Sequence, residues 1–253
     1  DKVDFSTSIG FDLTVTTMLC SLCFGSQVVV YPEQLQNLES YKDHLIRTGV
    51  NVVKLVPSYF ELLIDFLATT KINKVILGGE KLKSNIIDRL YKLYNTNKNN
   101  FDFIVYDEYG PTEVTVGTCN SLVYPNDDNL NIGKLYYNYK AYVLNKDLIP
   151  LPIGAIGELY IGGVGLARGY LNKAELTAER FIANPFQTEE ERKSSKNSRL
   201  YKTGDLVRWL PDGNLEYIGR NDFQVKVKGY RIELGEIEVV LSKYQGIKQS
   251  VVV

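Results

Sequence analysis

The alternation of strand and helix that decides the fold is clearest in residues 51–80, NVVKLVPSYFELLIDFLATTKINKVILGGE. An apolar run at Asn51–Val56 that stops at Pro57 predicts a buried strand, and Lys74–Leu77 predicts a second one. The segment between them, Tyr59–Leu67, has the spacing of a helix. The same alternation continues on both sides, with strands expected at Val28–Tyr31 and Asp102–Tyr106 and helices at Leu35–Arg47 and Asn85–Tyr94. This pattern predicts an α/β layer built on a mainly parallel sheet.

From about residue 130 the pattern becomes strand-rich, and Gly and Pro separate the runs. We expect strands at Lys140–Leu144, Gly157–Ile161 and Leu215–Ile218, one helix at Ala174–Phe181, a hairpin turn at Pro211–Gly213 and an exposed loop at Glu189–Lys196. Together they predict a β-rich, barrel-like unit. The last thirty or so residues predict the start of a small α+β unit, with a short strand around Val225–Tyr230, a helix from Gly235 and a strand at Gln249–Val253.

Charge and hydropathy exclude two classes of protein. The 253 residues carry 29 Lys and Arg against 30 Asp and Glu, a net charge of −1, whereas a protein that grips nucleic-acid phosphates has a basic surplus. The stretch between Asp12 and Glu33 is uncharged, but its Thr, Ser, Gln and Gly make it too polar for a membrane span. We expect it to form a buried helix, a turn at Gly25 and a strand. No nucleic-acid or membrane partner is therefore expected.

The cysteine and histidine content favours no disulfide framework and no metal centre. Cys20, Cys23 and Cys119 cannot form a complete set of disulfides, which favours a reducing, cytoplasmic location. Cys20 and Cys23 form a C-x-x-C, but a structural zinc site needs four ligands and the chain has only one further Cys and one His, His44. We interpret the pair as two small apolar residues one helical turn apart, and we expect His44 on the surface.

Three loops lie where open α/β sheets bind ligands, at the carboxyl ends of the strands. Gly78-Gly79-Glu80 follows one strand, DEYGPTE at 107–113 follows another, and Phe11-Asp12 begins the uncharged helix. Each has an ordinary alternative: Gly-Gly is usually a turn, Tyr-Gly-Pro-Thr suits a β-turn, and Thr112 could merely cap a helix. Taken singly, the loops identify no chemistry.

The second half adds three longer motifs: GELYIGGVGLARGYL at 157–171, YKTGDL at 201–206 and GRNDFQVKVKGYRIELGEIE at 219–238. In this order, together with the DEYGPTE loop, they make the whole chain resemble the adenylation domains of nonribosomal peptide synthetases. These domains belong to the adenylate-forming superfamily, with firefly luciferase and the acyl-CoA synthetases. The resemblance implies that ATP and an amino acid are joined to an aminoacyl-adenylate with release of pyrophosphate. The acyl group then passes to the phosphopantetheine thiol of a peptidyl carrier protein, beside a condensation domain of the same antibiotic-type assembly line.

The resemblance assigns the groups that handle ATP. Glu113 is the expected Mg²⁺ ligand, and Thr112 beside it is expected to hold a phosphate oxygen, which makes these two the catalytic residues. Asp205 is expected to accept both ribose hydroxyls, and Tyr109 and Tyr217 to flank the adenine. The remaining ATP-binding residues implied by the resemblance are Gly79, Asp107 and Arg220. Asp107 stands where the family usually has Asn at the adenine amino group, a mild departure because Asp can still accept that bond.

The resemblance also predicts boundaries. Residues 1–221 correspond to part of the large N-terminal subdomain, and residues 222–253 to the hinge, at Asp222, and the start of the small C-terminal subdomain. The family's phosphate-binding loop is expected upstream of Asp1, and its catalytic Lys beyond Val253. We therefore expect residues 1–253 alone to be an internal fragment with negligible adenylating activity.

The amino-acid pocket implied by the resemblance is lined by Asp12, Leu13, Thr16, Lys54, Ile76, Gly78, Glu108, Val116 and Gly117. Asp12 is expected to bind the α-ammonium group. Lys54 and Glu108 are either a structural ion pair or a donor and an acceptor for a carboxamide, and the set resembles the family's asparagine type. An Asp side chain would repel Glu108, and Gln is one methylene longer, so we predict L-Asn.

Two other functions remain open from the sequence. An acyl- or aryl-acid CoA ligase of the same superfamily would share most of the motifs, but its substrate has no ammonium group for Asp12 to bind. A non-catalytic, ligand-binding remnant would keep the pocket without the chemistry. The full-length gene would decide between a fragment and a remnant.

Overall fold

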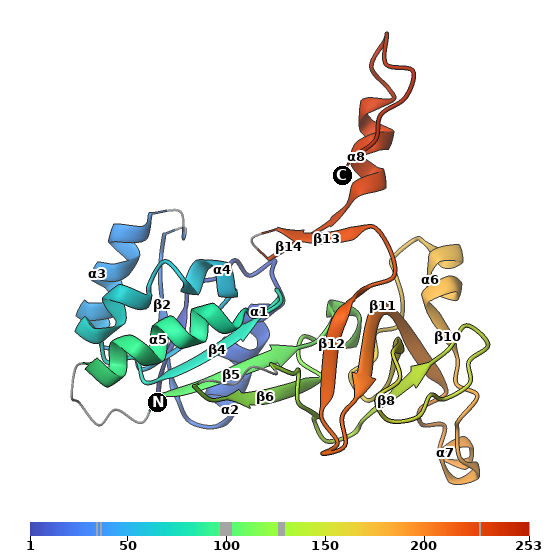
Figure 1. Cartoon of the computed structure of the whole chain (residues 1–253), viewed down its shortest axis with the longest axis horizontal. Helices are drawn as coiled ribbons and strands as arrows, with labels where there is room; N and C mark the ends of the chain where they lie inside the picture. The colour runs from blue at the N-terminus through green and yellow to red at the C-terminus, as the bar shows by residue number, and fades with distance from the viewer. Residues whose placement is uncertain (34, 36, 97–102, 126–129, 228, 253) are drawn as a thin grey trace.

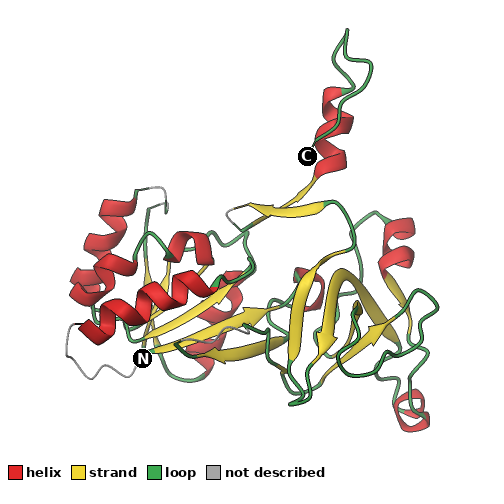
Figure 2. Ribbon diagram, viewed as in Figure 1, coloured by secondary structure: helices red, strands yellow, loops and turns green. Residues whose placement is uncertain are grey.

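The computed structural model describes residues 1–33, 35, 37–96, 103–125, 130–227 and 229–252, and it has two sheets side by side (Figure 1). A seven-stranded sheet with helices occupies the N-terminal half, and a five-stranded antiparallel sheet follows it (Figure 2). A two-stranded hairpin lies above both, and the last helix projects from it. The polar residues Asn95–Asn100 predict a solvated connection, and part of it lies outside the described residues. The first residue of the strand expected at Asp102–Tyr106 also lies outside them.

The first sheet confirms the predicted parallel α/β layer. Its strand order is β2-β1-β3-β4-β5-β6-β7, with parallel pairing from β2 to β5 and antiparallel pairing at β6 and β7. The strands are β1 Lys2–Phe5, β2 Gln27–Val30, β3 Val52–Leu55, β4 Lys74–Gly78, β5 Ile104–Tyr109, β6 Cys119–Val123 and β7 Lys134–Leu135. All four residues of β3 are buried, as expected of a strand covered on both faces.

Helices cover both faces of this sheet. The helices of the first half are α1 Leu13–Val15, the π-helix η1 Thr16–Cys20, α2 Ser21–Cys23, α3 Leu38–Thr48, α4 Pro57–Phe60, the 3₁₀-helix η2 Ile64–Thr69, α5 Ser84–Thr96 and the 3₁₀-helix η3 Thr112–Val114. On one face Val53 and Leu55 join the apolar core formed by α3, α4, η2 and α5. Because side chains alternate along a strand, Lys54 points to the opposite face, where it contacts Thr16 of η1.

The second sheet is antiparallel, in the order β10-β11-β9-β8, and β12 also pairs with β11. Its elements are β8 Tyr139–Leu144, β9 Gly157–Gly163, α6 Ala174–Arg180, β10 Phe181–Ala183, α7 Glu189–Lys193, β11 Arg199–Trp209 and β12 Leu215–Arg220. A bridge between Gly133 and Leu215 joins it to the first sheet. Only glycine fits there, because a Cβ on Gly133 would lie 1.6 Å from the carbonyl oxygen of Asn120 and its φ is +78°.

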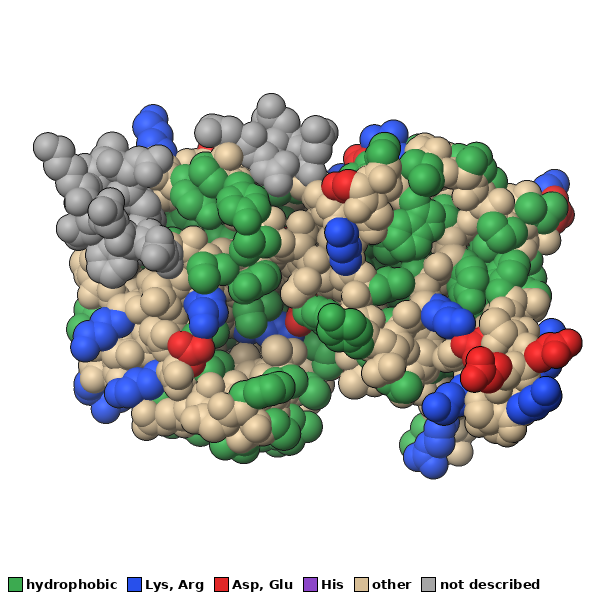
Figure 3. Space-filling model, turned by 90° about the horizontal axis from the view of Figure 1, so that it is seen from below, with side chains coloured by type: hydrophobic (Ala, Val, Ile, Leu, Met, Phe, Trp, Pro, Cys, Tyr) green, Lys and Arg blue, Asp and Glu red, His purple; other side chains and the backbone are tan. Residues whose placement is uncertain are grey.

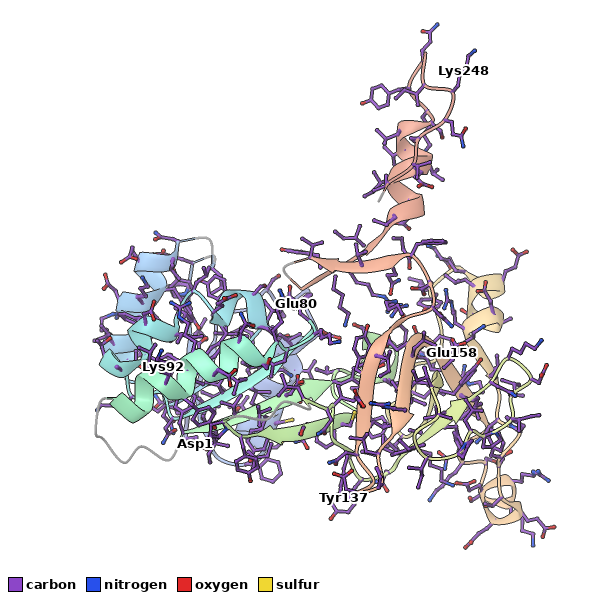
Figure 4. All side chains as sticks on the ribbon, in the orientation of Figure 1. Asp1, Glu80, Lys92, Tyr137, Glu158 and Lys248 are labelled. Atoms are coloured by element: carbon purple, nitrogen blue, oxygen red, sulfur yellow. The ribbon has the colours of Figure 1, made fainter. Side chains whose placement is uncertain are left out.

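The chain ends in β13 Gln224–Val227, β14 Tyr230–Glu233 and α8 Leu234–Leu241. The tip of the β13–β14 hairpin returns to the first sheet, where the Gly229 amide donates to Glu80 Oε1 at 2.8 Å. Glu80 lies beneath the hairpin in Figure 4. On the face seen from below, hydrophobic and charged side chains interleave, and the drawn Lys and Arg form no continuous stripe (Figure 3). Within the described residues, no helix is both long and apolar enough to cross a membrane.

Two expectations about side-chain burial are wrong. His44 is 4% exposed rather than on the surface, because α3 turns it inward beside Asp4 and the rings of Tyr31 and Tyr41. The uncharged helix is not fully buried either: Phe24 is 87% exposed, and Leu19, Leu22, Cys20 and Cys23 are also exposed. Cys119 is buried.

Three expectations about secondary structure are also wrong. The helix expected at Tyr59–Leu67 is instead the short helix α4 and the 3₁₀-helix η2, with a turn at residues 61–63 between them. The charged run at 189–196 begins with the short helix α7 instead of being a loop throughout, because Thr188 and Glu191 form a capping box. The described part of the expected strand at 249–253, residues 249–252, is not in a strand.

Candidate adenylate site

The candidate site is a cleft at the carboxyl ends of β4 and β5, between the two sheets and under the hairpin. Two adjoining cavities, both partly open to solvent and one larger than the other, form it. Both are lined by Gly79, Glu108, Tyr109, Asp205 and Lys226. The cleft therefore brings together residues from Phe11 to Arg231, more than 200 positions apart in sequence, at the edge where open α/β sheets bind ligands.

Strand register brings four of the predicted pocket residues to one face of the sheet. Lys54 of β3 is the register partner of Ile76 of β4, and Gly78 of β4 is the partner of Glu108 of β5. Residues 76 and 78 are two apart, so all four side-chain positions share a face. A Cβ on Gly78 would lie 2.8 Å from the carbonyl oxygen of Glu108, so glycine permits this close strand approach.

Lys54 and Glu108 form a buried ion pair. Lys54 is 2% exposed and Glu108 is 8% exposed, and Lys54 Nζ donates to Glu108 Oε2. Two more side chains hold the pair: Lys54 Nζ donates to Thr16 Oγ1 at 2.7 Å, and the Tyr136 hydroxyl donates to Glu108 Oε1 at 3.1 Å. A buried charge is costly unless it is paired and hydrogen-bonded, and here both charges are.

A strained turn forms the wall beside this ion pair. Thr115 and Val116 have φ values of +66° and +67°, a region that β-branched residues rarely adopt. Val116 lines the larger cavity with Leu13, and Gly117 follows directly. Such strain is typical of segments whose conformation is fixed by a binding site.

Asp12 lines the same cavity and contacts Thr112. The Thr112 hydroxyl donates to Asp12 Oδ2 at 2.5 Å, across 100 residues of sequence. Asp12 is the residue before α1, yet its side chain makes no capping bond to that helix. Its carboxylate is therefore turned into the cleft instead of stabilising the helix end.

Glu113 is held by Arg231 of β14. Arg231 Nη1 lies 2.9 Å from both carboxylate oxygens of Glu113, and the Tyr170 hydroxyl donates to Oε1 at 2.6 Å. Burial opposes ionisation of Glu113, but Arg231 and Tyr170 outweigh it and lower the pKa of the carboxyl group. Glu113 is thus a carboxylate already facing a cation.

Glu113 is an oxygen donor of the kind that Mg²⁺ prefers, although Arg231 contacts both of its oxygens in this structure. Mg²⁺ prefers oxygen ligands and usually binds one or two carboxylates together with substrate phosphates. Among the described residues, no cluster of three or more His, Cys, Asp or Glu suited to a metal occurs. Glu113 would hold the ion, in place of the cationic Arg231.

Asp205 is the centre of a second polar network, at a register shift in β11. It accepts from the Tyr109 hydroxyl and, at 2.7 Å, from Arg220 Nη1. Burial raises the pKa of Asp205, although Arg220 and Tyr109 oppose the shift. Arg220 also binds both carboxylate oxygens of Asp222, at 2.7 Å each. Tyr217 lies against Tyr109, with ring centroids 6.2 Å apart.

Asp107 lines the smaller cavity and differs from the other carboxylates of the site. It is 7% exposed, and burial followed by the charge of Glu108 raises its pKa from 3.8 to about 7. The group is therefore largely protonated below neutral pH. A neutral carboxylic acid has a donor and an acceptor, as the carboxamide of Asn has.

Most of the predicted site residues line the cleft, but six do not. Thr16, Lys54 and Gly117 lie behind Glu108, Ile76 lies beside Lys54 in register, Glu113 lies behind Arg231, and Asp222 is reached only through Arg220. The roles assigned to all these residues remain predictions.

Several contacting residues were not assigned from the sequence. Glu80, Tyr170, Lys226 and Arg231 lie inside the quoted motifs, so the motifs marked them without giving a role. Burial lowers the pKa of Lys226 where its side chain enters both cavities. Tyr136 lies in no quoted motif, and nothing in the sequence pointed to it.

Comparison with protein families agrees with this geometry. The sequence profile described as AMP-binding enzyme matches residues 2–171. N-(5-amino-5-carboxypentanoyl)-L-cysteinyl-D-valine synthase of Penicillium rubens is 42% identical over 249 residues, 96% of this chain and 6% of that protein. Tyrocidine synthase 3 of Brevibacillus parabrevis is 38% identical over 260 residues, 100% of this chain and 4% of that protein. The chain thus spans less than a tenth of either relative.

Solved structures show the same arrangement. Holo-PA1221, described as an NRPS protein containing adenylation and PCP domains and bound to a vinylsulfonamide inhibitor, superposes with a TM-score of 0.85 at 25% identity. The match covers 98% of this chain and 42% of that one. IdnL1 superposes with a TM-score of 0.84 at 23% identity, over 100% of this chain and 51% of the other, which shows a shared fold.

Proposed function

This chain belongs to the AMP-binding enzyme family, and from that premise we propose that it is part of an amino-acid adenylation domain of a nonribosomal peptide synthetase. The proposed reaction joins the carboxylate of an amino acid to the α-phosphate of ATP and releases pyrophosphate. The aminoacyl group then passes to the phosphopantetheine thiol of a peptidyl carrier protein. We propose Asp222 as the hinge that switches the domain between these two half-reactions. We also propose a condensation domain as a neighbour in the same assembly line.

One observation carries the choice of an amino acid: Asp12 Oδ2 lies within hydrogen-bonding distance of Thr112, in the same cavity as Glu108. In our proposal this carboxylate binds the substrate α-ammonium group. Once the ammonium group donates to Asp12, the single O–H of Thr112 would be released from Asp12 and could donate to a phosphate oxygen instead. Fatty and aryl acids have no ammonium group, so Asp12 would leave them with an uncompensated negative charge beside their carboxylate.

The nucleotide would be bound by the polar network on the other side of the cleft. We assign the ribose hydroxyls to Asp205, the adenine faces to Tyr109 and Tyr217, and the adenine amino group to Asp107. Bound Mg²⁺ would neutralise charge on the triphosphate, with Glu113 as its protein ligand. Burial disfavours ionisation of Asp205, so ribose hydroxyls that donate to it would replace hydrogen bonds otherwise lost from water.

The proposed amino acid is L-Asn. Lys54 has three N–H donors, and Thr16 and Glu108 use two of them. Because Lys54 lies behind Glu108, its third donor would reach a carboxamide oxygen only if the pocket rearranged on binding. Each oxygen of Glu108 already accepts one bond and can accept a further one, from the carboxamide NH₂. An Asp carboxylate about 4 Å from Glu108 would cost roughly 4 kcal/mol at an effective dielectric of about 20, partly offset by Lys54. Gln adds a methylene, worth about 1–3 kcal/mol of discrimination.

The test compares two nonhydrolysable ligands that differ only in the amine. One is the 5′-O-sulfamoyladenosine conjugate of L-Asn, and the other is its deamino counterpart, the conjugate of succinamic acid. By titration calorimetry the amine should improve binding to the chain at least tenfold, as expected of a charge-assisted bond. Asp12→Asn should abolish that difference. Equal affinities in the unsubstituted chain would instead favour an acyl- or aryl-acid ligase.

A further inference from the structure

The carboxylate of Glu108 has two protein donors, one on each oxygen. Lys54 holds Oε2, and the Tyr136 hydroxyl holds Oε1 at 3.1 Å. Tyr136 follows β7, and its backbone amide donates to the carbonyl oxygen of Thr118 at 2.8 Å, which fixes where its ring begins. The two donors come from different parts of the fold, β3 of the parallel layer and the segment after β7.

We propose that Tyr136 is a positioning residue that makes the pocket selective for a carboxamide over a carboxylate by fixing the orientation of Glu108. This inference rests on the proposed function, because it concerns the same amino-acid pocket. Tyr136 acts through Glu108: it lines neither cavity, whereas Glu108 lines both.

The last torsion of a glutamate side chain is soft, so the carboxylate plane needs external restraint. With Lys54 as the only donor, the carboxylate could rotate until both oxygens face the ammonium group. Both oxygens of Glu108 would then accept hydrogen bonds from Lys54, and neither would be directed at the substrate. The bond from Tyr136 keeps Oε1 away from Lys54, so Glu108 continues to present acceptor lone pairs and negative charge to the pocket. That presentation favours an N–H donor and disfavours a second carboxylate.

The hydroxyl can serve only as a donor to Glu108. Burial, and then the charge of Glu108, raise the pKa of Tyr136 well above its ordinary value. The group therefore keeps its proton throughout the pH range in which proteins are assayed, and the bond to Glu108 persists.

Gly117 provides the space for this arrangement. A Cβ at Gly117 would lie 2.8 Å from both Cδ and Oε1 of Glu108 and 2.9 Å from Cε2 of Tyr136. Contacts this short do not occur, so any side chain there would push the carboxylate and the ring apart. Gly117→Ala should therefore lower the same selectivity as loss of the Tyr136 hydroxyl, by a different physical route.

The experiment measures the affinities of the chain for the asparaginyl and aspartyl conjugates of 5′-O-sulfamoyladenosine. Tyr136→Phe removes the hydroxyl alone. We expect the Asn conjugate to bind about tenfold more weakly, as for loss of a bond to a charged group, and the Asp conjugate to lose less. The Asn-to-Asp affinity ratio should fall accordingly.

The matched control is Tyr91→Phe, which removes a hydroxyl that donates to the carbonyl oxygen of Val123 at 3.1 Å; neither residue lines the two cavities. The Asn-to-Asp affinity ratio of Tyr91→Phe should equal that of the unsubstituted chain. In a Glu108→Gln background, Tyr136→Phe should alter the ratio less than in the unsubstituted chain, because the group it positions is gone. Thermal unfolding of each variant identifies any that fail to fold. Gly117→Ala is a second, independent variant for which we expect a lower Asn-to-Asp affinity ratio.

The outcomes separate the two proposals. If the unsubstituted chain does not prefer the Asn conjugate, the proposed substrate is wrong and the role of Tyr136 is wrong with it. If the unsubstituted chain prefers Asn and folded Tyr136→Phe keeps the same ratio, only the role of Tyr136 is overturned. The same holds if Tyr136→Phe changes the ratio equally with and without Glu108.

Discussion

Asp107 gives the most quantitative prediction, because its pKa is far from its ordinary value. Burial, with a contribution from Glu108, raises that pKa from 3.8 to about 7. Between these values the folded protein holds a proton that the unfolded chain has lost. Unfolding then releases the proton, so the contribution of Asp107 to stability decreases as pH rises through this range.

The magnitude follows from the two pKa values. At about 1.4 kcal/mol per pH unit, the interval from 3.8 to about 7 corresponds to about 4 kcal/mol. From about pH 5 to about pH 8, a practical range, the loss is about 2–3 kcal/mol. Asp107→Asn keeps the shape of the neutral acid and removes the titration. The variant should therefore become more stable relative to the unsubstituted chain, by about this amount, as pH rises.

The assay is urea unfolding of residues 1–253 at a series of pH values, with the free energy of unfolding compared between the two proteins. Asp88→Asn, on an exposed position of α5, is the matched control and should show no such trend. A difference between Asp107→Asn and the unsubstituted chain that is independent of pH would mean that Asp107 is ionised in the folded protein. Burial would then not raise the pKa of Asp107 as described above.

Three further substitutions test separate parts of the account. Arg231→Gln removes the partly exposed ion pair with Glu113, a loss of about 1 kcal/mol. Hydrogen exchange of the β13–β14 hairpin amides should therefore accelerate severalfold, and unchanged exchange rates would contradict this prediction. Gly204→Ala should lower the free energy of unfolding, measured in urea, by about 1–3 kcal/mol. Gly204 has a φ of +77°, and a Cβ there would lie 2.7 Å from Asp222 Oδ2. An unchanged free energy of unfolding would show that the loop relaxes freely. Asp222→Pro, in a polypeptide that carries out both half-reactions, should reduce thioester formation more than pyrophosphate exchange, and equal losses would argue against a hinge there.

The layered fold could be predicted where apolar patterning was continuous. The fully buried strand β3 and the strand β4 were expected at nearly their observed bounds. The strand β1 was missed because it is short and carries two charged residues, Lys2 and Asp4. Asp4 is buried because Tyr41 and Ser6 donate hydrogen bonds to it, and no local sequence pattern predicts those bonds. The expectation that His44 lies on the surface was wrong for a similar reason, because its burial depends on the packing of α3 against Asp4 of β1.

The site was predictable to the extent that motifs marked it. Asp12, Glu108 and Asp205 were named from sequence and share one cavity. The pairing of Arg231 with Glu113 could not be foreseen, because it depends on how the hairpin folds back across 118 residues of sequence. Tyr136 had no signal at all, since its contact with Glu108 arises from the geometry of the chain after β7.

The central claim is that this cleft binds an aminoacyl-adenylate and selects L-Asn. Titration calorimetry of the chain with 5′-O-sulfamoyladenosine conjugates of all the common amino acids tests it most directly, since binding needs no turnover. We expect the Asn conjugate to bind most tightly, with the Asp and Gln conjugates at least tenfold weaker. Tightest binding of the Asp conjugate or of a hydrophobic one, or equal binding of all, would contradict it.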